Sequence, residues 1–283
     1  MSAPPERRWG ARYFAELYRA QIRQGVAVML QYRFAMVIWG VWGFVGPLVS
    51  LAIWNAASSA RGGTIVNAAN GASFQRGDFA AYFLTFMVFG HMTMSWDAFE
   101  YGWRVRTGGL SPLLLRPVDP IHADAARNVS FKLITSAILL PVWILLAWLL
   151  QPTPPESGWS LLLATPALLL AAVMRYVWQY CLAMVAFWTT RVEAIQQLYF
   201  TVDAFLGGRV APLALLPGWL GVLAAWSPFR GMGAFPVELA LGRIPAEQIA
   251  PAFLAQVGWL VVALLAYRAL WRLGLRRYSA VGA

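Results

Sequence analysis

The chain has 283 residues, of which 60% are hydrophobic and only 12% are charged. Ordinary soluble domains contain about 45–50% apolar and about 25% charged residues. This much apolar surface cannot be enclosed in one water-soluble core, because a soluble surface must be covered with polar groups. The composition therefore excludes a soluble enzyme and a disordered chain, and it predicts an integral membrane protein.

The charge is strongly basic, with 22 Lys and Arg residues against 12 Asp and Glu residues and a net charge of +10. The basic residues lie between and beside apolar segments rather than in one run, which argues against nucleic-acid binding. Only Lys132 among them is a lysine, which is compatible with a high-GC bacterial genome. The single cysteine, Cys181, excludes an intrachain disulfide and a cysteine zinc site.

Several apolar segments are long enough to cross a bilayer, which takes about 20 residues of helix. We predict six membrane spans, at 34–54, 79–98, 133–150, 160–187, 194–211 and 252–271. A further apolar segment, 212–242, contains Pro212, Pro217, Pro228 and Pro236. It is expected to form two short helices of a re-entrant hairpin, since broken helices at membrane depth must be buried in protein or line a cavity. The predicted fold is thus all-α, in one membrane domain over 1–283.

The distribution of basic residues predicts the orientation of these spans. Sixteen of the 22 Lys and Arg residues lie on the side that holds both termini, and five lie on the other side. Both termini are therefore expected in the cytoplasm of a bacterial inner membrane, including the tail 272–283, and the re-entrant hairpin on the extracytoplasmic side.

An amphipathic helix is predicted before the first span, within residues 9–32. Arg12, Glu16, Arg19 and Arg23 repeat at helical spacing opposite aromatic residues such as Phe14. This pattern favours a helix lying on the cytoplasmic leaflet, where an arginine-rich face meets anionic lipid. The alternative is a solvated helix that merely precedes the first span.

The loop between the second and third spans, 108–120, reads GGLSPLLLRPVDP. The second span is expected to continue as helix until Gly108 and Gly109, after which Ser111 would cap a very short helix carrying three leucines. Pro117 would end that helix, and Asp119 with Pro120 would begin the helix of the third span. Three consecutive leucines here favour docking into an apolar cleft of a soluble partner. Alternatively, this helix folds back on the membrane surface or on the amphipathic helix.

Two ionisable residues are expected inside the membrane, Arg175 in the fourth span and Asp203 in the fifth. Counting ~1.5 Å per residue from the turn between these spans, their depths differ by about one helical turn, which an arginine can bridge. A structural ion pair and a role in a substrate cavity or gate both remain open. His91 is expected to be a packed, hydrogen-bonded histidine, and Asp97 and Glu100 to be partners of Arg104.

Three stretches together resemble the ABC-2 type permeases, most closely their uncharacterised exporter branch: GGLSPLLLRPVDP, GGRVAPLALLPGWL followed by SPF, and GLRRYSAVGA. The resemblance covers essentially the whole chain. It implies that the short loop helix is a coupling helix seated in an ATP-binding subunit, and that 212–242 holds the gate helices. The coupling role falls on Gly109, Leu110, Leu113, Leu114, Leu115, Arg116 and Pro117.

The same resemblance implies a pathway formed by two permease chains, identical or related, that exports amphipathic molecules. Its expected lining lies on the first and fifth spans, with Trp39, Trp42, Phe44, Tyr199 and Phe200. Lys132 is not preceded by the glycine spacing of a nucleotide-binding loop, so ATP and Mg²⁺ are expected only in a partner subunit, with no cofactor or metal in this chain. The alternatives are an ATP-independent secondary transporter or channel, a lipid-modifying enzyme lacking an evident reactive pair, and a membrane scaffold.

Overall fold

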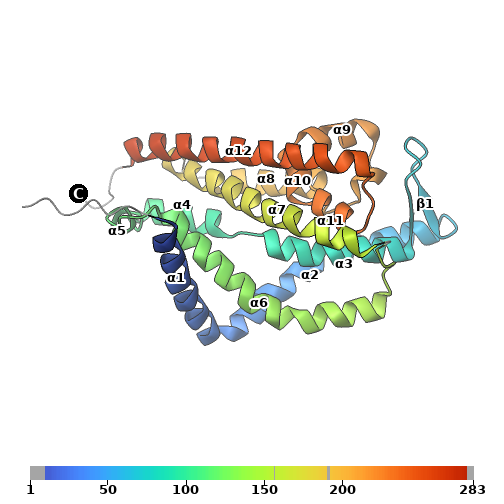
Figure 1. Cartoon of the computed structure of the whole chain (residues 1–283), viewed down its shortest axis with the longest axis horizontal. Helices are drawn as coiled ribbons and strands as arrows, with labels where there is room; N and C mark the ends of the chain where they lie inside the picture. Colours follow the sequence, from blue (N-terminus) through green and yellow to red (C-terminus); the bar gives the residue numbers. More distant parts are fainter. Residues whose placement is uncertain (1–9, 156, 190–191, 279–283) are drawn as a thin grey trace, which may run out of the picture.

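The computed structural model describes residues 10–155, 157–189 and 192–278 (Figure 1). Within it, the side chains of Arg33, Met36, Trp39, Asp97, Ala98 and Phe99 are not described. The regular elements are α1 (Ala11–Gln31), α2 (Arg33–Ser59), β1 (Thr64–Val66), β2 (Ser73–Gln75), α3 (Arg76–Thr93), α4 (Asp97–Arg106), α5 (Ser111–Leu114), α6 (Pro120–Leu150), α7 (Gly158–Met184), α8 (Val192–Leu206), α9 (Gly218–Trp226), α10 (Pro228–Met232), α11 (Ala234–Ala240) and α12 (Ala246–Arg277), with short 3₁₀ turns at Val185–Phe187 and Leu213–Leu215.

The helices form an elongated bundle whose two ends differ (Figure 1). One end holds α5, the start of α1 and the end of α12, and we call it the loop end. The opposite end holds β1 and β2, and we call it the hairpin end. Helix α7 runs through the middle and packs against α12, α11, α4 and α3, whereas α1 and α2 pack against α6.

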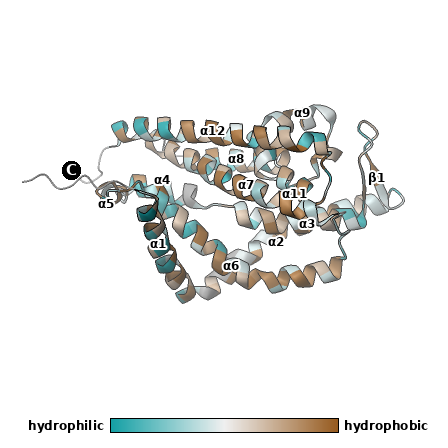
Figure 2. Cartoon of the chain, viewed as in Figure 1, coloured by the Kyte–Doolittle hydropathy of each residue, from teal (hydrophilic) through white to brown (hydrophobic). Residues whose placement is uncertain are grey.

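Four helical segments are long and apolar enough to cross a membrane: Gly40–Ser59, Pro120–Leu150, Gly158–Phe187 and Ala246–Arg277. Hydrophobic residues run along α6, α7 and α12, whereas α1 carries many hydrophilic ones (Figure 2). These helices confirm a multi-pass membrane protein, and they overlap four of the six predicted spans. The other two correspond to α3 and α8, which have 18 and 15 residues.

The second predicted span, 79–98, is wrong as one continuous helix that runs on to Gly108. Helix α3 ends at Thr93, Met94 is extended with φ −63° and ψ 146°, and α4 begins at Asp97. The carbonyl of Met94 accepts a hydrogen bond from Asn128 Nδ2 of α6 at 3.4 Å. At the break, the Met94 carbonyl is therefore satisfied by a side chain of another helix.

The fifth predicted span, 194–211, ends earlier than expected. Helix α8 stops at Leu206, and Gly208 adopts a positive φ of 81°. The hydroxyl of Tyr82 donates to the Gly208 carbonyl at 2.8 Å, so the turn is held against α3. A 15-residue helix spans only about 22 Å, less than the roughly 30 Å of hydrocarbon.

The apolar segment 212–242 is broken more often than predicted. It forms three helices, α9, α10 and α11, instead of two. Pro217 precedes α9, and Pro228 begins α10, where a missing N–H costs nothing. Pro236 lies in the first turn of α11 and does not break it. Helix α11 packs on α7 and α3, which buries Phe235 and Val237.

The all-α prediction is confirmed, and a short β-hairpin that was not predicted lies at the hairpin end. Strands β1 and β2 are antiparallel, with Ile65 opposite Phe74. Both of these side chains are buried in a cluster with Phe79 of α3. Alternation is visible over only three residues per strand, too few to signal a strand in the sequence.

Candidate functional site

The loop 108–120 folds into a compact projection at the loop end. Gly108 has a φ of 75°, a left-handed turn that suits glycine, and α5 begins at Ser111. The predicted capping role of Ser111 is wrong: Leu110 occupies the cap position, and Ser111 Oγ instead shares a hydrogen bond of 2.9 Å with the hydroxyl of Tyr278. The turn is therefore tied to the residue that follows α12.

The leucines of this loop differ sharply in exposure. Leu110 is fully buried, and Leu113 and Leu114 pack partly buried against the same core cluster. Leu115 is 87% exposed, and Arg116 and Pro117 are exposed beside it. The accessible tip is therefore Leu115, Arg116 and Pro117, while the other leucines attach the tip to the bundle.

Two aspartates connect this loop to the rest of the loop end. Asp119 accepts the Ile121 N–H at 3.2 Å, so it caps α6, and it also accepts the hydroxyl of Tyr267 of α12 at 2.8 Å. Asp124 pairs with Arg104 of α4 at 2.8 Å and accepts the hydroxyl of Tyr180 of α7 at 3.0 Å. Four helices are thus joined by carboxylate hydrogen bonds around α5.

The predicted pair of Glu100 and Arg104 is confirmed at 3.2 Å, whereas the side chain of Asp97 lies outside those described. Asp124, the closer partner of Arg104, was missed because it lies 20 residues away on another helix. Tyr101 lies beneath this network. Burial, followed by the charges of Asp119 and Asp124, raises the pKa of its hydroxyl far above the ordinary value.

Helix α1 lies obliquely across the bundle and packs along α6 (Figure 1). The hydroxyl of Tyr18 shares a hydrogen bond of 3.0 Å with His122, and Ser130 Oγ donates to the Ile22 carbonyl at 3.2 Å. No residue of α1 is buried, so one long side of this helix is open. The predicted amphipathic helix is therefore present, and its contact with a membrane stays a prediction.

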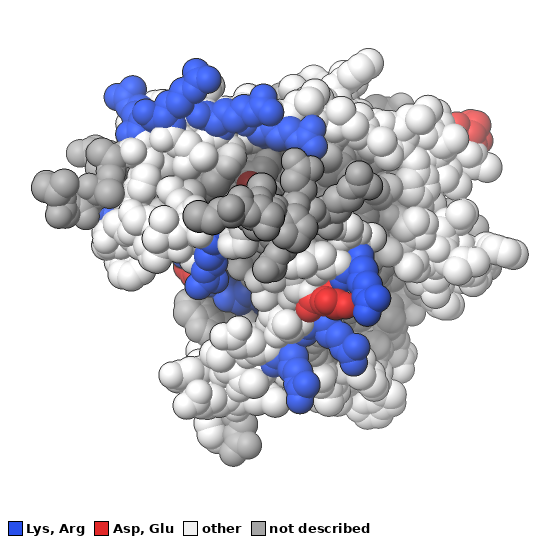
Figure 3. All heavy atoms as spheres, turned by 60° about the vertical axis from the view of Figure 1, so that its left-hand side comes forward, with Lys and Arg blue, Asp and Glu red and all other residues white. Residues whose placement is uncertain are grey.

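Basic side chains gather over the loop end (Figure 3). The last turn of α12 contributes Arg276 and Arg277, and the last turn of α4 contributes Arg104 and Arg106. This end has the charge expected of a cytoplasmic face.

A second charged group lies within the bundle, between α7 and the end of α8. Arg175 Nη1 lies 2.7 Å from Asp203 Oδ2, and both side chains are almost fully buried. Arg175 also donates to the Met232 carbonyl of α10 at 3.1 Å. The structure therefore brings together the two residues whose depths the sequence matched.

Asp203 has a second basic neighbour, Arg209, at 3.5 Å. We call Arg175, Asp203 and Arg209 the charge cluster. A continuous helix over the predicted fifth span, 194–211, would carry Arg209 away from Asp203. Since α8 ends at Leu206 and the chain turns back at Gly208, Arg209 reaches Asp203 instead.

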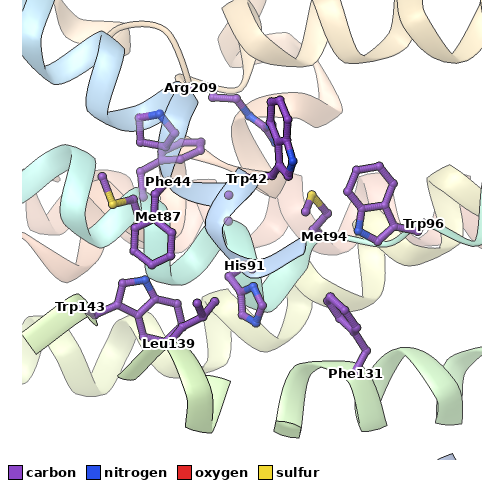
Figure 4. A pocket seen from close by; sticks show the side chains of 16 residues that line it. Trp42, Phe44, Met87, His91, Met94, Trp96, Phe131, Leu139, Trp143 and Arg209 are labelled. Atoms are coloured by element: carbon purple, nitrogen blue, oxygen red, sulfur yellow. The ribbon is translucent and has the colours of Figure 1, made fainter. Parts of the chain in front are cut away.

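A cavity of about 550 Å³ lies between α2, α3 and α6, and we call it the α2–α6 cavity (Figure 4). Arg209 lies on one side of it, and Leu139, Trp143 and Phe131 of α6 lie on the other. Trp42, Phe44, Met87 and His91 complete much of the wall. His91 shares a hydrogen bond of 2.9 Å with Thr135 Oγ1, as expected of a packed histidine.

Of the predicted pathway residues, the structure brings only some together. Trp42 and Phe44 line the α2–α6 cavity, and the side chain of Trp39 lies outside those described. Tyr199 and Phe200 do not line it; the ring of Tyr199 packs against Phe229 with centroids 5.4 Å apart.

The glycines of α2 have different uses. Gly40 lets α2 approach α6, because a Cβ there would lie 2.8 Å from Leu139. Gly43 and Gly46 instead face open space and line the cavity. These glycines thus provide both a close contact between helices and part of the volume beside it.

Within the described ranges, no group of three His, Cys, Asp or Glu side chains could hold a metal ion. A comparison with curated proteins finds no significant match. The family model described as "ABC-2 family transporter protein" matches residues 69–282, which include the loop, the charge cluster and all helices from α3 onward. Members of this family are membrane components that lack the ATPase domain and work with ATPase subunits. The chain therefore belongs to the ABC-2 family of transporter membrane proteins.

Proposed function

We propose that the chain is the permease subunit of an ATP-driven exporter in a bacterial inner membrane. Two permease chains would form the pathway, and separate subunits would bind ATP and Mg²⁺. The loop end, with its basic side chains, the start of α1 and the end of α12, would face the cytoplasm. In this arrangement the six predicted spans include α3 and α8, and α9 to α11 form the extracytoplasmic re-entrant segment.

One observation carries this proposal: an exposed apolar tip stands on a rigidly connected base. Leu115 is accessible, whereas Leu110 beneath it is fully buried. Asp119, directly after the tip, bonds to both α6 and α12. A movement of the tip would therefore be transmitted through these hydrogen bonds to α6 and α12. A leucine flanked by Arg116 suits an apolar cleft with an acidic rim.

The test is the substitution Leu115→Asp in the tagged full chain, purified in mild detergent with its associated proteins. We expect a stoichiometric ATP-binding subunit with the wild-type chain and its loss from the variant, because a buried carboxylate would be unpaired. Val66→Asp is the matched control, since Val66 is exposed at the hairpin end. The control should keep the subunit and ATP-dependent transport in liposomes.

Two results would overturn the coupling role. One is a Leu115→Asp variant that retains both ATPase association and transport. The other is transport by the purified chain alone, driven by an ion gradient with no response to ATP. The second result would identify the alternative, a secondary transporter or channel.

A further inference from the structure

We propose that the α2–α6 cavity binds an amphipathic anion, with its hydrocarbon chain along the cavity wall and its anionic group at Arg209. Only the suggestion that such a molecule is the exported substrate rests on the proposed function. Binding itself requires no ATPase.

The cavity has the size and lining of a ligand site. Its volume of about 550 Å³ falls within the 300–1,000 Å³ of typical ligand pockets. Phe44, Phe86, Met87 and Leu139 provide apolar walls, and Gly43 leaves space for a guest. Trp42 lines the cavity while 68% exposed, so the cavity opens at the surface of the chain.

The charge cluster is not balanced, because two guanidinium groups share one carboxylate. Asp203 lies closer to Arg175, at 2.7 Å, than to Arg209, at 3.5 Å. Arg209 Nε is buried and has no hydrogen-bond partner within the described part of the chain. A charged group at membrane depth without full compensation is costly, so an anion at this position would be stabilised.

The cavity wall holds a second buried hydrogen-bond donor without a partner in the described part of the chain. The indole Nε1 of Trp143, which lines the cavity, is also buried without a hydrogen-bond acceptor in the described ranges. Arginine is well suited to carboxylate and phosphate groups, which accept two parallel hydrogen bonds. A neutral or cationic amphiphile would leave the extra positive charge uncompensated, so the charge of the cluster selects for anions.

The irregular backbone beside the cavity is also consistent with a ligand-binding site. The non-helical residues between α3 and α4 include Met94 and Trp96, and both line the cavity. Irregular backbone at membrane depth is tolerated where it lines a cavity or is buried in protein. The break in α3 and the charge cluster therefore flank one space, although they come from segments far apart in the chain.

The test measures binding to the purified full-length chain in dodecyl maltoside without ATP. The probe is a palmitate that carries a photoreactive diazirine, and its primary amide serves as the matched neutral probe. We expect the carboxylate to label peptides of α2, α3 and α6, and excess palmitate to displace it. The amide should bind about tenfold more weakly or worse, since it lacks the charge-assisted hydrogen bonds.

Two variants locate the site. Arg209→Gln should weaken carboxylate binding about tenfold and leave amide binding unchanged, whereas Arg61→Gln, at an exposed position, should change neither. Gly43→Leu should block both probes by filling the cavity without touching the charge cluster, and Gly258→Leu is its control, since a Cβ at either glycine meets open space. Equal labelling by carboxylate and amide, unchanged binding to Arg209→Gln, or labelling outside the cavity would each overturn the proposal.

The anion could be a resident phospholipid or a molecule in transit. Nanodiscs of phosphatidylcholine with and without phosphatidylglycerol distinguish these sources. Displacement of the probe by phosphatidylglycerol would identify a lipid headgroup, and its absence would identify a single-chain anion; both results support the proposal. Because binding is read without ATPase subunits, its success or failure is independent of the Leu115→Asp experiment.

Discussion

Neutralising Asp203 should destabilise the chain more than neutralising Arg175, even though the two side chains form one ion pair. Asp203 is the only acidic member of the charge cluster, and it lies within 3.5 Å of both Arg175 and Arg209. The variant Asp203→Asn leaves the buried guanidinium group of Arg175 and the partly exposed one of Arg209 without a counter-charge. The variant Arg175→Gln leaves Asp203 with Arg209.

The structure sets the size of each effect. Removing one partner from a buried ion pair costs about 3–5 kcal/mol, because the remaining charge is uncompensated. We expect a loss of this size for Asp203→Asn. For Arg175→Gln we expect about 1.5–3 kcal/mol, the cost of a charge-assisted hydrogen bond when a second basic group remains. Glu16→Gln is the control, since its bond to Arg12 is solvent-exposed and such pairs contribute about 0.3–0.5 kcal/mol.

The assay is equilibrium unfolding in mixed micelles of dodecyl maltoside and increasing SDS, followed by far-ultraviolet circular dichroism. The expected order of lost unfolding free energy is Asp203→Asn, then Arg175→Gln, then Glu16→Gln. A loss for Arg175→Gln that equals or exceeds that for Asp203→Asn would show that Arg209 does not compensate Asp203. It would also remove the charge argument for an anion at the α2–α6 cavity.

Two further predictions concern the packing of α12. Gly274→Leu should destabilise the chain by about 1–3 kcal/mol, because a side chain at this glycine would overlap the ring of Phe187. Gly258→Leu on the same helix should be nearly neutral, since a Cβ there meets open space. Equal melting temperatures for the two variants would contradict this prediction. Tyr267→Phe removes the hydroxyl donor to Asp119 and should lower the unfolding free energy by about 1 kcal/mol in the SDS unfolding assay. An unchanged unfolding midpoint would show that this hydrogen bond does not stabilise the loop end.

The membrane helices could be predicted from the sequence because their length follows from the thickness of the bilayer. Helices α6, α7 and α12 are long apolar runs whose ends are marked by Asp119, Gly158 and basic residues. The break after Thr93 could not be predicted in the same way. No proline or glycine lies between Gly90 and Gly102, and the freed carbonyl of Met94 is satisfied by Asn128 of another helix.

The candidate site also contains contacts that could be predicted from the sequence and contacts that could not. The Arg175 and Asp203 contact followed from the constant rise of a helix, which fixes depth along each span. The role of Arg209 depends on a chain reversal at Gly208 that is held by Tyr82 of α3. Likewise, the burial of Leu110 and the exposure of Leu115 depend on how α5 packs, since the leucines of this loop are identical in hydropathy.

In the proposed exporter, the break between α3 and α4 is the joint between the two candidate sites. Helix α3 lines the cavity through Met87 and His91, while α4 is bonded to the loop end through Arg104 and Asp124. Had α3 and α4 been one continuous helix, a tilt of the loop end would displace the whole helix together. With Met94 extended between them, we expect a movement of α4 with the loop end to change the cavity wall at Met94 and Trp96. The irregular backbone thus provides a short route by which movement at α5 would alter the affinity for a bound anion.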